Sequence, residues 1–463
     1  MSTIIKIISD ILKIPELRKR IFLTFALLFV FRIGFHIYLP GIDVESFRAS
    51  QNQDNGGGMM DFIAWTSRLT GGMFDQPVLF SLGIMPYITA SIIFSLLVKV
   101  FPRLEALSKE GEAGRRTINR YTRYATVLIC VVQSILLVTQ WWSPVSAGGS
   151  DAGYIVTDPD SGFVLRFMQI LCLTTGSVFL MWLGEKITEV GIGNGTSLLI
   201  MVGIIAAMPG ALVDQVEGIL RAPEDMKPLL VVKGLILVAL YLGVVAGVVF
   251  ITKGQRRIPV QQQRSVRGRR VYGGQRSYMP FRVNPAGVLP IIFAQSLIVL
   301  PTSFMAMMAS QQGTPEFLRN IFGGISTALG FNTMLYFVAY VGMIVFFTYF
   351  WTSLMFNPVE IANNMKEYGS FIPGIRPGKR TAEYLERIMK RITLAGAAFL
   401  SIIALVPQII HQAMDVQMMV SSFLGGTGIL IVVGVGLDLV DKIEAQLLVR
   451  QYEGFMRSGE RTD

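Results

Sequence analysis

Histidine and cysteine are almost absent from this chain. Its 463 residues include two histidines, His36 and His411, and two cysteines, Cys130 and Cys172. Metal sites and catalytic triads depend heavily on these residue types, and a disulfide framework or a Cys-x-x-Cys motif needs closely spaced cysteines. Both cysteines stand in apolar stretches, where they behave as small apolar residues. We therefore expect no metal, no cofactor and no redox role.

Charged residues are scarce as well. Only 16% of the residues are charged, whereas 52% are hydrophobic. This composition predicts a polytopic membrane protein, because it offers too little polar surface to cover soluble cores of this total size. Ten segments are long and apolar enough to span a membrane, near residues 21–38, 79–98, 124–140, 163–183, 196–208, 229–251, 288–308, 334–356, 392–410 and 420–440. The first segment is too long for a cleavable signal peptide and lacks a small-residue cleavage site.

Basic residues are distributed unevenly among the connecting segments. The N-terminal residues 1–20 and the loops 99–123, 252–287 and 357–391 hold 28 lysines and arginines, whereas the five alternating loops hold 5. Basic residues are retained on the cytoplasmic side of a membrane, so both termini are expected in the cytoplasm. Residues 1–20 are expected to form an amphipathic cytoplasmic segment and 441–463 a cytoplasmic tail.

One of these loops is richer in arginine than retention requires. From Arg256 to Arg276, seven arginines and no acidic residue occur in 21 positions. Arginines of this kind also contact the phosphates of nucleic acids or acidic protein surfaces. On the residues alone, a topology signal and a docking surface remain equally open.

Two segments come close to catalytic motifs but lack required parts. "GIRPGKRT", Gly374 to Thr381, has three residues between its glycines where a phosphate-binding loop needs four, and Arg380 replaces the serine or threonine that holds magnesium. "GVGLDLVD" places Asp438 at the end of the last span, but an intramembrane aspartyl protease needs a second aspartate facing it from another helix. We expect no enzymatic activity.

An internal repeat indicates transport. "GIMPYITA", Gly83 to Ala90, and "GVLPIIFA", Gly287 to Ala294, share G-x-x-P-x-I-x-A at a separation of 204 residues, each at the start of a span. With five spans in each half, the two copies would cross the membrane in opposite directions, as in many transport folds. A secondary transporter would also need charged groups at mid-membrane, and apart from Arg32 and Arg166 the spans offer almost no ionisable groups. That alternative stays open.

Six stretches then resemble, in order, the signatures of the SecY family of bacterial translocon channel subunits. They are "SLGIMPYITASIIFSLL", "KEGEAGRRTINRYTRY", "FLMWLGEKITEVGIGNGTSLLI", "NPAGVLPIIFAQS", "FNPVEIANNMKEYGSFIPGIRPGKRTAEYL" and "LGGTGILIVVGVGLDLV". The resemblance covers about residues 15 to 455. It implies an all-α polytopic membrane protein with ten transmembrane helices in two inverted five-helix halves, residues 21–208 and 209–440, around a central pore with a short plug helix.

The resemblance also implies a ring of apolar side chains that seals the pore. The matching positions are Ile84, Ile88, Thr196, Ile200, Ile292 and Ile431. Thr196 stands where relatives often have an aliphatic residue, so the ring is expected to seal slightly less tightly or to be wetter on one side. The plug is expected at about residues 60–74, with Asp61, Phe62, Ile63, Ala64, Trp65, Thr66, Ser67, Arg68 and Leu69 at its centre.

The family's partners complete the expectation. The loops 252–287 and 357–391 would dock on the ribosome or the SecA motor ATPase through Arg256, Arg257, Arg269, Arg270 and Arg376. SecE and SecG would be further subunits, and secretory and membrane-protein precursors the substrates. The chain would lie in the lipid bilayer of the bacterial inner membrane, passing unfolded polypeptides across it and releasing hydrophobic segments sideways.

Overall fold

A computed structural model provides the coordinates. It describes residues 14–42, 76–141, 162–221, 223, 225, 227–262, 265–267, 270–272, 276–310, 315–330, 333–414 and 426–459. The chain divides into two compact units. Unit 1 comprises Met1–Val213 and Val435–Asp463, and unit 2 comprises Asp214–Gly434. The expected plug and the first 13 residues lie outside the described residues.

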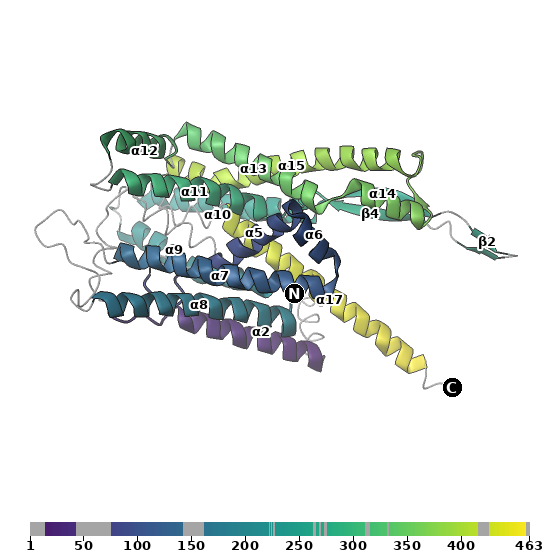
Figure 1. Ribbon diagram of the computed structural model, residues 1–463, viewed down its shortest axis with the longest axis horizontal. Coiled ribbons are helices and arrows are strands. Elements are labelled where there is room, and N and C mark those ends of the chain that lie inside the picture. Colours follow the sequence, from purple (N-terminus) through teal and green to yellow (C-terminus); the bar gives the residue numbers. More distant parts are fainter. Residues whose placement is uncertain are drawn as a thin grey trace, which may run out of the picture. The chain divides into compact units, whose positions relative to one another are not determined.

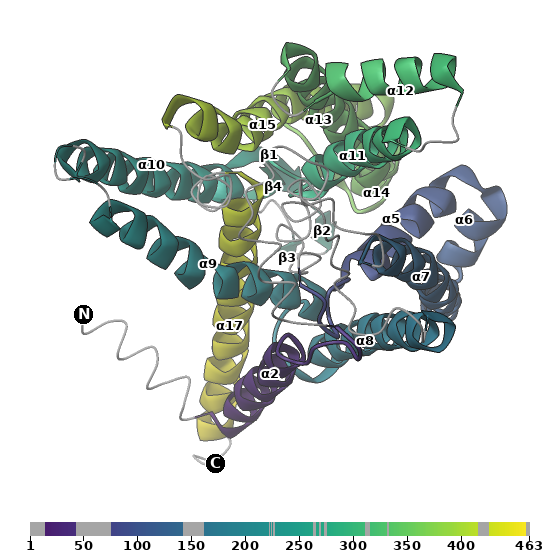
Figure 2. The same cartoon turned by 90° about the vertical axis from the view of Figure 1, so that its left-hand side faces the viewer.

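The described secondary-structure elements of unit 1 are helices, apart from one isolated β-bridge. Its elements are α2 (Pro15–Gly34), α5 (Met85–Val100), α6 (Pro102–Lys109), α7 (Glu112–Trp141), α8 (Gly162–Val190), the first part of α9 (Gly195–Arg221) and the last part of α17 (Thr427–Gly459). Helices α2, α8 and α7 run side by side (Figures 1 and 2). A polar contact joins two of them, because the hydroxyls of Ser134 on α7 and Thr174 on α8 lie 3.2 Å apart. Small polar side chains of this kind let membrane helices approach closely.

Unit 2 contains the second group of long helices. They are α10 (Lys227–Lys253), α11 (Leu289–Ser310), α13 (Met334–Met355) and α15 (Lys379–Met414), together with the shorter α12 (Glu316–Ala328) and α14 (Pro358–Glu367). Their core is centred on α13, whose buried Tyr336, Tyr340 and Ile344 pack with Ile291 of α11 and Leu400 of α15. The rings of Tyr336 and Tyr340 stack with centroids 5.6 Å apart.

A small antiparallel sheet interrupts the helical pattern of unit 2. Strands β1 (Gln255–Gln262), β4 (Arg276–Arg282) and β5 (Ser370–Phe371) pair in the order β4-β1-β5, and β2 (Ser265–Arg267) pairs with β3 (Arg270–Tyr272). Ile258, Val260 and Phe281 point into a cluster with Leu385 and Met389 of α15. The all-α expectation missed this sheet. In β1, buried Ile258 and Val260 alternate with exposed neighbours, which is typical of a strand with one covered face. This alternation of apolar and polar residues was the only sign of the strand in the sequence.

The helices agree with a multi-pass membrane protein. Each of the ten expected spans overlaps a helix. Within the described residues, five helices are long and apolar enough to cross a membrane, and a sixth span results if α5 and α6, bent by 99° at their junction, count as one. The total of ten therefore stays a prediction. Large apolar side chains face outward along α2, among them Phe22, Phe25 and Phe29.

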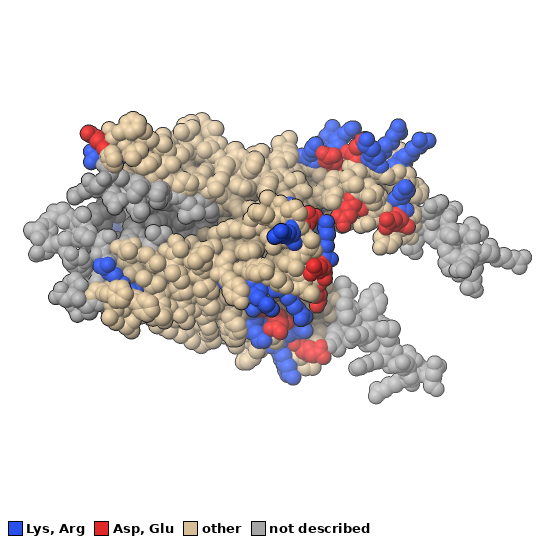
Figure 3. All heavy atoms as spheres, viewed as in Figure 1, with Lys and Arg blue, Asp and Glu red and all other residues tan. Residues whose placement is uncertain are grey.

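Charged side chains avoid the middle of the helices. On the face shown in Figure 3 they gather toward the helix ends, and the described surface between is almost free of them. In unit 2 the basic side chains concentrate at the end formed by β1, β4, α14 and the start of α15. An uncharged band between charged ends is the surface that a bilayer requires.

Candidate functional site

The segment that leads into α5 is fixed to the end of α2. Val78 forms an antiparallel bridge with Tyr38, and the backbone N–H of Leu79 donates to the carbonyl oxygen of Ile37 at 2.9 Å. Ser81 is completely buried, and its hydroxyl oxygen accepts from the N–H of Val78 at 2.9 Å. These bonds hold the chain rigidly at the position where α5 begins.

Aromatic rings hold the same segment from the sides. Phe80, only 2% exposed, lies among Phe31 and Phe35 of α2 and Phe179 of α8, with ring centroids 6.4, 5.8 and 6.0 Å away. Stacked and edge-to-face pairs at these separations add to the stabilisation from burial. We call Phe31, Phe35, Phe80 and Phe179 the aromatic clamp. It fixes the start of α5, where Ile84 stands.

The two copies of the internal repeat adopt the same local conformation. Gly83 has φ +55° and Gly287 has φ +62°, a region that favours glycine. Each glycine lies two residues before the start of a helix, α5 at Met85 and α11 at Leu289. Pro at the second helical position suits such a start, because no intrahelical bond needs its missing N–H. The shared glycine and proline are thus explained by one helix-start geometry, used once in each unit.

Four of the six expected ring positions belong to unit 1. Ile84 and Ile200 are buried, and Ile88 and Thr196 are half-buried. Ile84 and Thr196 meet at Gly184 of α8, where a Cβ atom would lie 3.1 Å from Thr196 Cγ2 and 3.4 Å from Ile84 Cδ1. A side chain at Gly195 would collide with the carbonyl oxygen of Gly184. These glycines allow α8, α9 and the start of α5 to approach closely, as small residues do between membrane helices.

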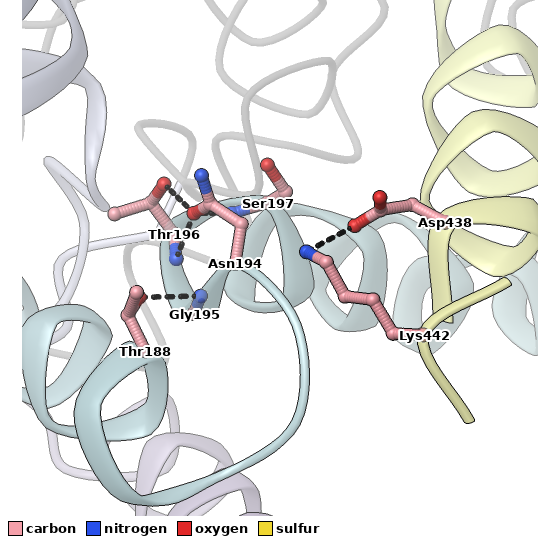
Figure 4. Close-up of polar contacts among 7 residues, drawn as sticks. All are labelled: Thr188, Asn194, Gly195, Thr196, Ser197, Asp438 and Lys442. Atoms are coloured by element: carbon pink, nitrogen blue, oxygen red, sulfur yellow. Dashed lines mark hydrogen bonds and ion pairs between the residues drawn. The ribbon is translucent and has the colours of Figure 1, made fainter. Parts of the chain in front are cut away.

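The hydroxyl of Thr196 is used in capping α9 (Figure 4). It donates to Asn194 Oδ1 at 2.6 Å, and the same oxygen accepts from the backbone N–H of Thr196 at 3.1 Å and of Ser197 at 3.4 Å. Thr188 Oγ1 accepts from the N–H of Gly195 at 2.8 Å. Asparagine before a helix satisfies N–H groups that have no intrahelical partner. Thr196 therefore places its hydroxyl on the cap and its methyl group against Gly184.

Asp438 lies close to this turn on α17, where it pairs with Lys442. The Lys442 ammonium is 2.6 Å from Asp438 Oδ2, one helical turn away (Figure 4). A side chain at Gly193 would lie 3.0 Å from Leu439 Cδ2, so the turn before α9 packs on α17. The exposed Asp438 is therefore ion-paired. Among the residues that the structure describes, no group of three or more His, Cys, Asp and Glu side chains could hold a metal ion.

An ion pair connects α7 and α8 beside Gly184. Arg123 Nε donates to Glu185 Oε1 at 3.0 Å, and its NH2 group is 2.8 Å from Oε2. Two parallel hydrogen bonds fix the geometry more firmly than a single contact. Sequence reasoning counted Arg123 only as a basic loop residue. It also missed Phe80, Gly184 and Asn194, of which only Asn194, directly before an apolar run, carried a recognisable capping signal.

The remaining ring positions belong to unit 2. Ile292 on α11 is half-buried, directly after the fully buried Ile291. Ile431 on α17 is buried and follows Ile429 and Leu430, which belong to the core around α13. The six-residue ring remains a prediction, as does the plug.

The expected docking arginines are partly described. Arg256 and Arg257 are exposed on β1, and Arg376 is exposed in the loop after β5, where its carbonyl oxygen accepts from the hydroxyl of Thr381 at 2.9 Å. Because β1 also pairs with β5, the loops 252–287 and 357–391 belong to one folded body. Arg270 lies on β3, but its side chain is outside the described part, as is all of Arg269.

Comparison with known proteins decides the family. The protein-family model SecY matches residues 78–440. The chain is 42% identical over 447 residues to the protein translocase subunit SecY of Streptomyces galbus, covering 96% of this chain and 98% of the relative. It is 39% identical over 442 residues to the SecY subunit of Escherichia coli K12, covering 96% and 94%.

The chain belongs to the SecY family. It is thus a subunit of a protein translocase, and the secondary transporter is not favoured.

The SecY fold is shared with solved channels. One, described as a protein conducting channel, aligns with a TM-score of 0.57 at 18% identity over 92% of this chain and 91% of that one. Sec61 in the canine ribosome-channel complex aligns with a TM-score of 0.54 at 17% identity over 92% and 91%.

Proposed function

We propose that this chain is the protein-conducting subunit of a bacterial Sec translocase, with ten spans in the inner membrane and both termini in the cytoplasm. The observation that carries this proposal is the 42% identity to a translocase subunit over 96% of the chain. The uncharged band between charged helix ends supports the membrane location. The concentration of basic residues in alternate loops supports the orientation.

The six ring residues form the seal of the channel in this proposal. Five isoleucines and Thr196 would surround the narrow waist, where apolar walls exclude water and ions by dewetting. Such walls form no directional bonds that would retain a sliding peptide. The hydrogen bond from the Thr196 hydroxyl to Asn194 supports this role, because it satisfies the one polar side-chain group of the six residues within the protein.

Hydrophobic segments leave the channel sideways between its halves. Apolar residues at mid-membrane contribute about −0.3 to −0.6 kcal/mol each to insertion, and a central charge opposes it by about 2.5 to 3.5 kcal/mol. Ten apolar residues therefore contribute roughly −3 to −6 kcal/mol, and one or two charges cancel this. Sorting of this kind needs no catalytic residue and no bound cofactor.

Residues 60–74 close the outer funnel as a plug in the resting channel. This assignment rests on the resemblance alone. Deleting Asp61 to Leu69 is expected to permit export of precursors with defective signals. Continued retention of a defective-signal reporter, with normal export of an intact precursor, would remove the plug from the proposal.

The docking surface is formed by the arginines of β1, β3 and the loop after β5. Support comes from the exposure of Arg256, Arg257 and Arg376 and from the pairing of β1 with β5. A ribosome or the SecA motor would bind there and supply the driving force, while SecE and SecG would complete the assembly. The Sec61 relative was solved in a complex with a ribosome, which is consistent with such a partner.

Reconstitution tests the whole proposal. Proteoliposomes containing this chain with SecE and SecG, given SecA, ATP and a secretory precursor, should protect the precursor from added protease. Liposomes lacking this chain, and a precursor without its signal, are the controls. Uptake of a small solute without any precursor protection would contradict the proposal and favour a transporter.

A further inference from the structure

The connection between α11 and α13 contains a helix too short to cross a membrane. Helix α12 has 13 residues, which at 1.5 Å per residue reach about 20 Å, against about 30 Å of hydrocarbon in a bilayer. Figure 2 shows α12 from the side, whereas α11 and α13 of the same unit are foreshortened, so its axis runs across theirs. It lies at the end of unit 2 opposite the basic strands and α14 (Figure 1).

One face of α12 packs on α11. A Cβ atom at Gly323 would lie 3.9 Å from the Cβ of Ala309, which is ordinary van der Waals contact. The hydroxyls of Ser326 and Thr327 both donate back to the carbonyl oxygen of Gly323, at 3.1 and 2.7 Å. The hydroxyls of both residues are therefore satisfied within the helix.

A second face is apolar and uncovered among the described residues. Phe317 is 74% exposed, and Leu318, Ile321 and Ile325 are 39, 39 and 37% exposed. At about 100° per residue, these four side chains lie within an arc of roughly 100°. Glu316, Asn320 and Thr327 lie outside this arc. The apolar face contains no charge, which makes water a poor neighbour for it.

The end of α12 is fixed to the start of α13. The hydroxyl of Thr333 donates to the carbonyl oxygens of Ala328 and Gly330, both at 2.7 Å. Directly beyond this turn, Met334, Leu335 and Val338 are 76, 54 and 59% exposed on α13, one of the helices suited to crossing a membrane. Exposed apolar side chains therefore stand on both sides of this turn, on α12 and at the start of α13.

We propose that α12 lies flat in the membrane interface, with Phe317, Leu318, Ile321 and Ile325 inserted among the lipids of the leaflet opposite the basic loops. Amphipathic helices of this kind bury their apolar face about 5–10 Å into the boundary between headgroups and acyl chains. Lipid is the occupant because the face is uncharged and is followed along the chain by exposed apolar side chains at the start of α13, a helix suited to crossing a membrane. The contact anchors the outer ends of α11 and α13 to the bilayer.

Spin-label accessibility along α12 tests the proposal. In a variant with Cys130→Ala and Cys172→Ala, single cysteines at Phe317, Ile321, Asn320 and Ser326 would carry nitroxides in liposomes. We expect a ratio of oxygen to nickel-chelate accessibility several-fold higher at Phe317 and Ile321 than at Asn320, the matched control on the polar side. Ser326, which is half-buried and donates to the carbonyl oxygen of Gly323, should be less accessible to both reagents than Phe317.

Two results would overturn the inference. Free access of the nickel chelate to positions 317 and 321 would place the face in water, and exclusion of both reagents there would place it against protein.

A second measurement uses the unmodified chain, photolabelled by a phospholipid with a diazirine in its upper acyl chain. Adducts are expected on Phe317 and Ile321 as well as on Met334. Labelling of Met334 without any labelling of α12 would also refute lipid contact.

Discussion

The contact at Gly184 gives a direct test of how the seal is positioned. Replacing Gly184 with alanine puts a methyl group 3.1 Å from Thr196 Cγ2 and 3.4 Å from Ile84 Cδ1 and Leu199 Cδ1. The 3.1 Å contact is tighter than ordinary van der Waals contact, so Thr196 must move by a few tenths of an ångström, whereas Ile84 and Leu199 at 3.4 Å can stay. Thr196 is an expected ring position, and its displacement should therefore open the resting channel slightly.

Two opposing effects of the Gly184→Ala change can be separated. Alanine in place of glycine within a helix favours folding by about 0.8–1.0 kcal/mol. An added methyl group in a packed site opposes it by about 1–3 kcal/mol, here at the lower end because the required shift is small. The overall free energy of unfolding should hardly change, because these two effects nearly cancel. The steric contact acts only in the closed ring, so it destabilises the closed state of the channel relative to the leaky one. A loss of about 1 kcal/mol raises the leaky population about fivefold.

Ion current through planar bilayers measures this leak, and thermal unfolding in detergent measures stability. Adding Thr196→Ser to Gly184→Ala removes Cγ2 but keeps the hydroxyl on Asn194, so the double variant should leak less than Gly184→Ala alone. Gly342→Ala on α13 is the matched control, because its Cβ meets nothing within 4 Å. An equal or greater leak in the double variant would refute the steric reasoning.

Three further outcomes follow from the same structure. Phe80→Ala should lower stability by about 3–5 kcal/mol, because the aromatic clamp loses its central ring; an unchanged unfolding temperature would contradict this. Ile88→Ser and Ile292→Ser should each raise resting ion current without preventing folding, and no increase in either would argue against a seal at these positions. Arg256→Glu with Arg257→Glu should weaken co-sedimentation with ribosomes or SecA most at low salt, since each lost phosphate contact reduces the salt dependence. Unchanged binding to both partners would reduce these arginines to a topology signal.

Much of the fold could be predicted because membrane helices follow from apolar length alone. A run of about 20 apolar residues must satisfy its own backbone hydrogen bonds in lipid, so it forms a helix. All ten expected segments overlap helices. The sheet was missed because Ile258 and Val260 stand in an arginine-rich stretch, whose charge outweighed a short strand pattern.

The candidate site was predictable only where a motif marked it. Gly83 and Gly287 repeat with their prolines, and the structure shows why, since both begin a helix from a left-handed conformation. Gly184 carries no such mark, because glycine is common in membrane helices. Its role depends on Thr196 and Ile84, which lie 12 and 100 residues away along the chain.

The sequence by itself determined the multi-pass membrane class, the helical segments and the family. Each of these depends on local composition, on residue order or on a count, and none requires contacts between distant segments. The tertiary structure alone decided that Phe80 lies within the aromatic clamp, that Thr196 uses its hydroxyl on Asn194, and that β1 pairs with β5. It also decided which face of α12 is covered. The helix packs on α11 where Gly323 meets Ala309, and Phe317 on another face is left exposed.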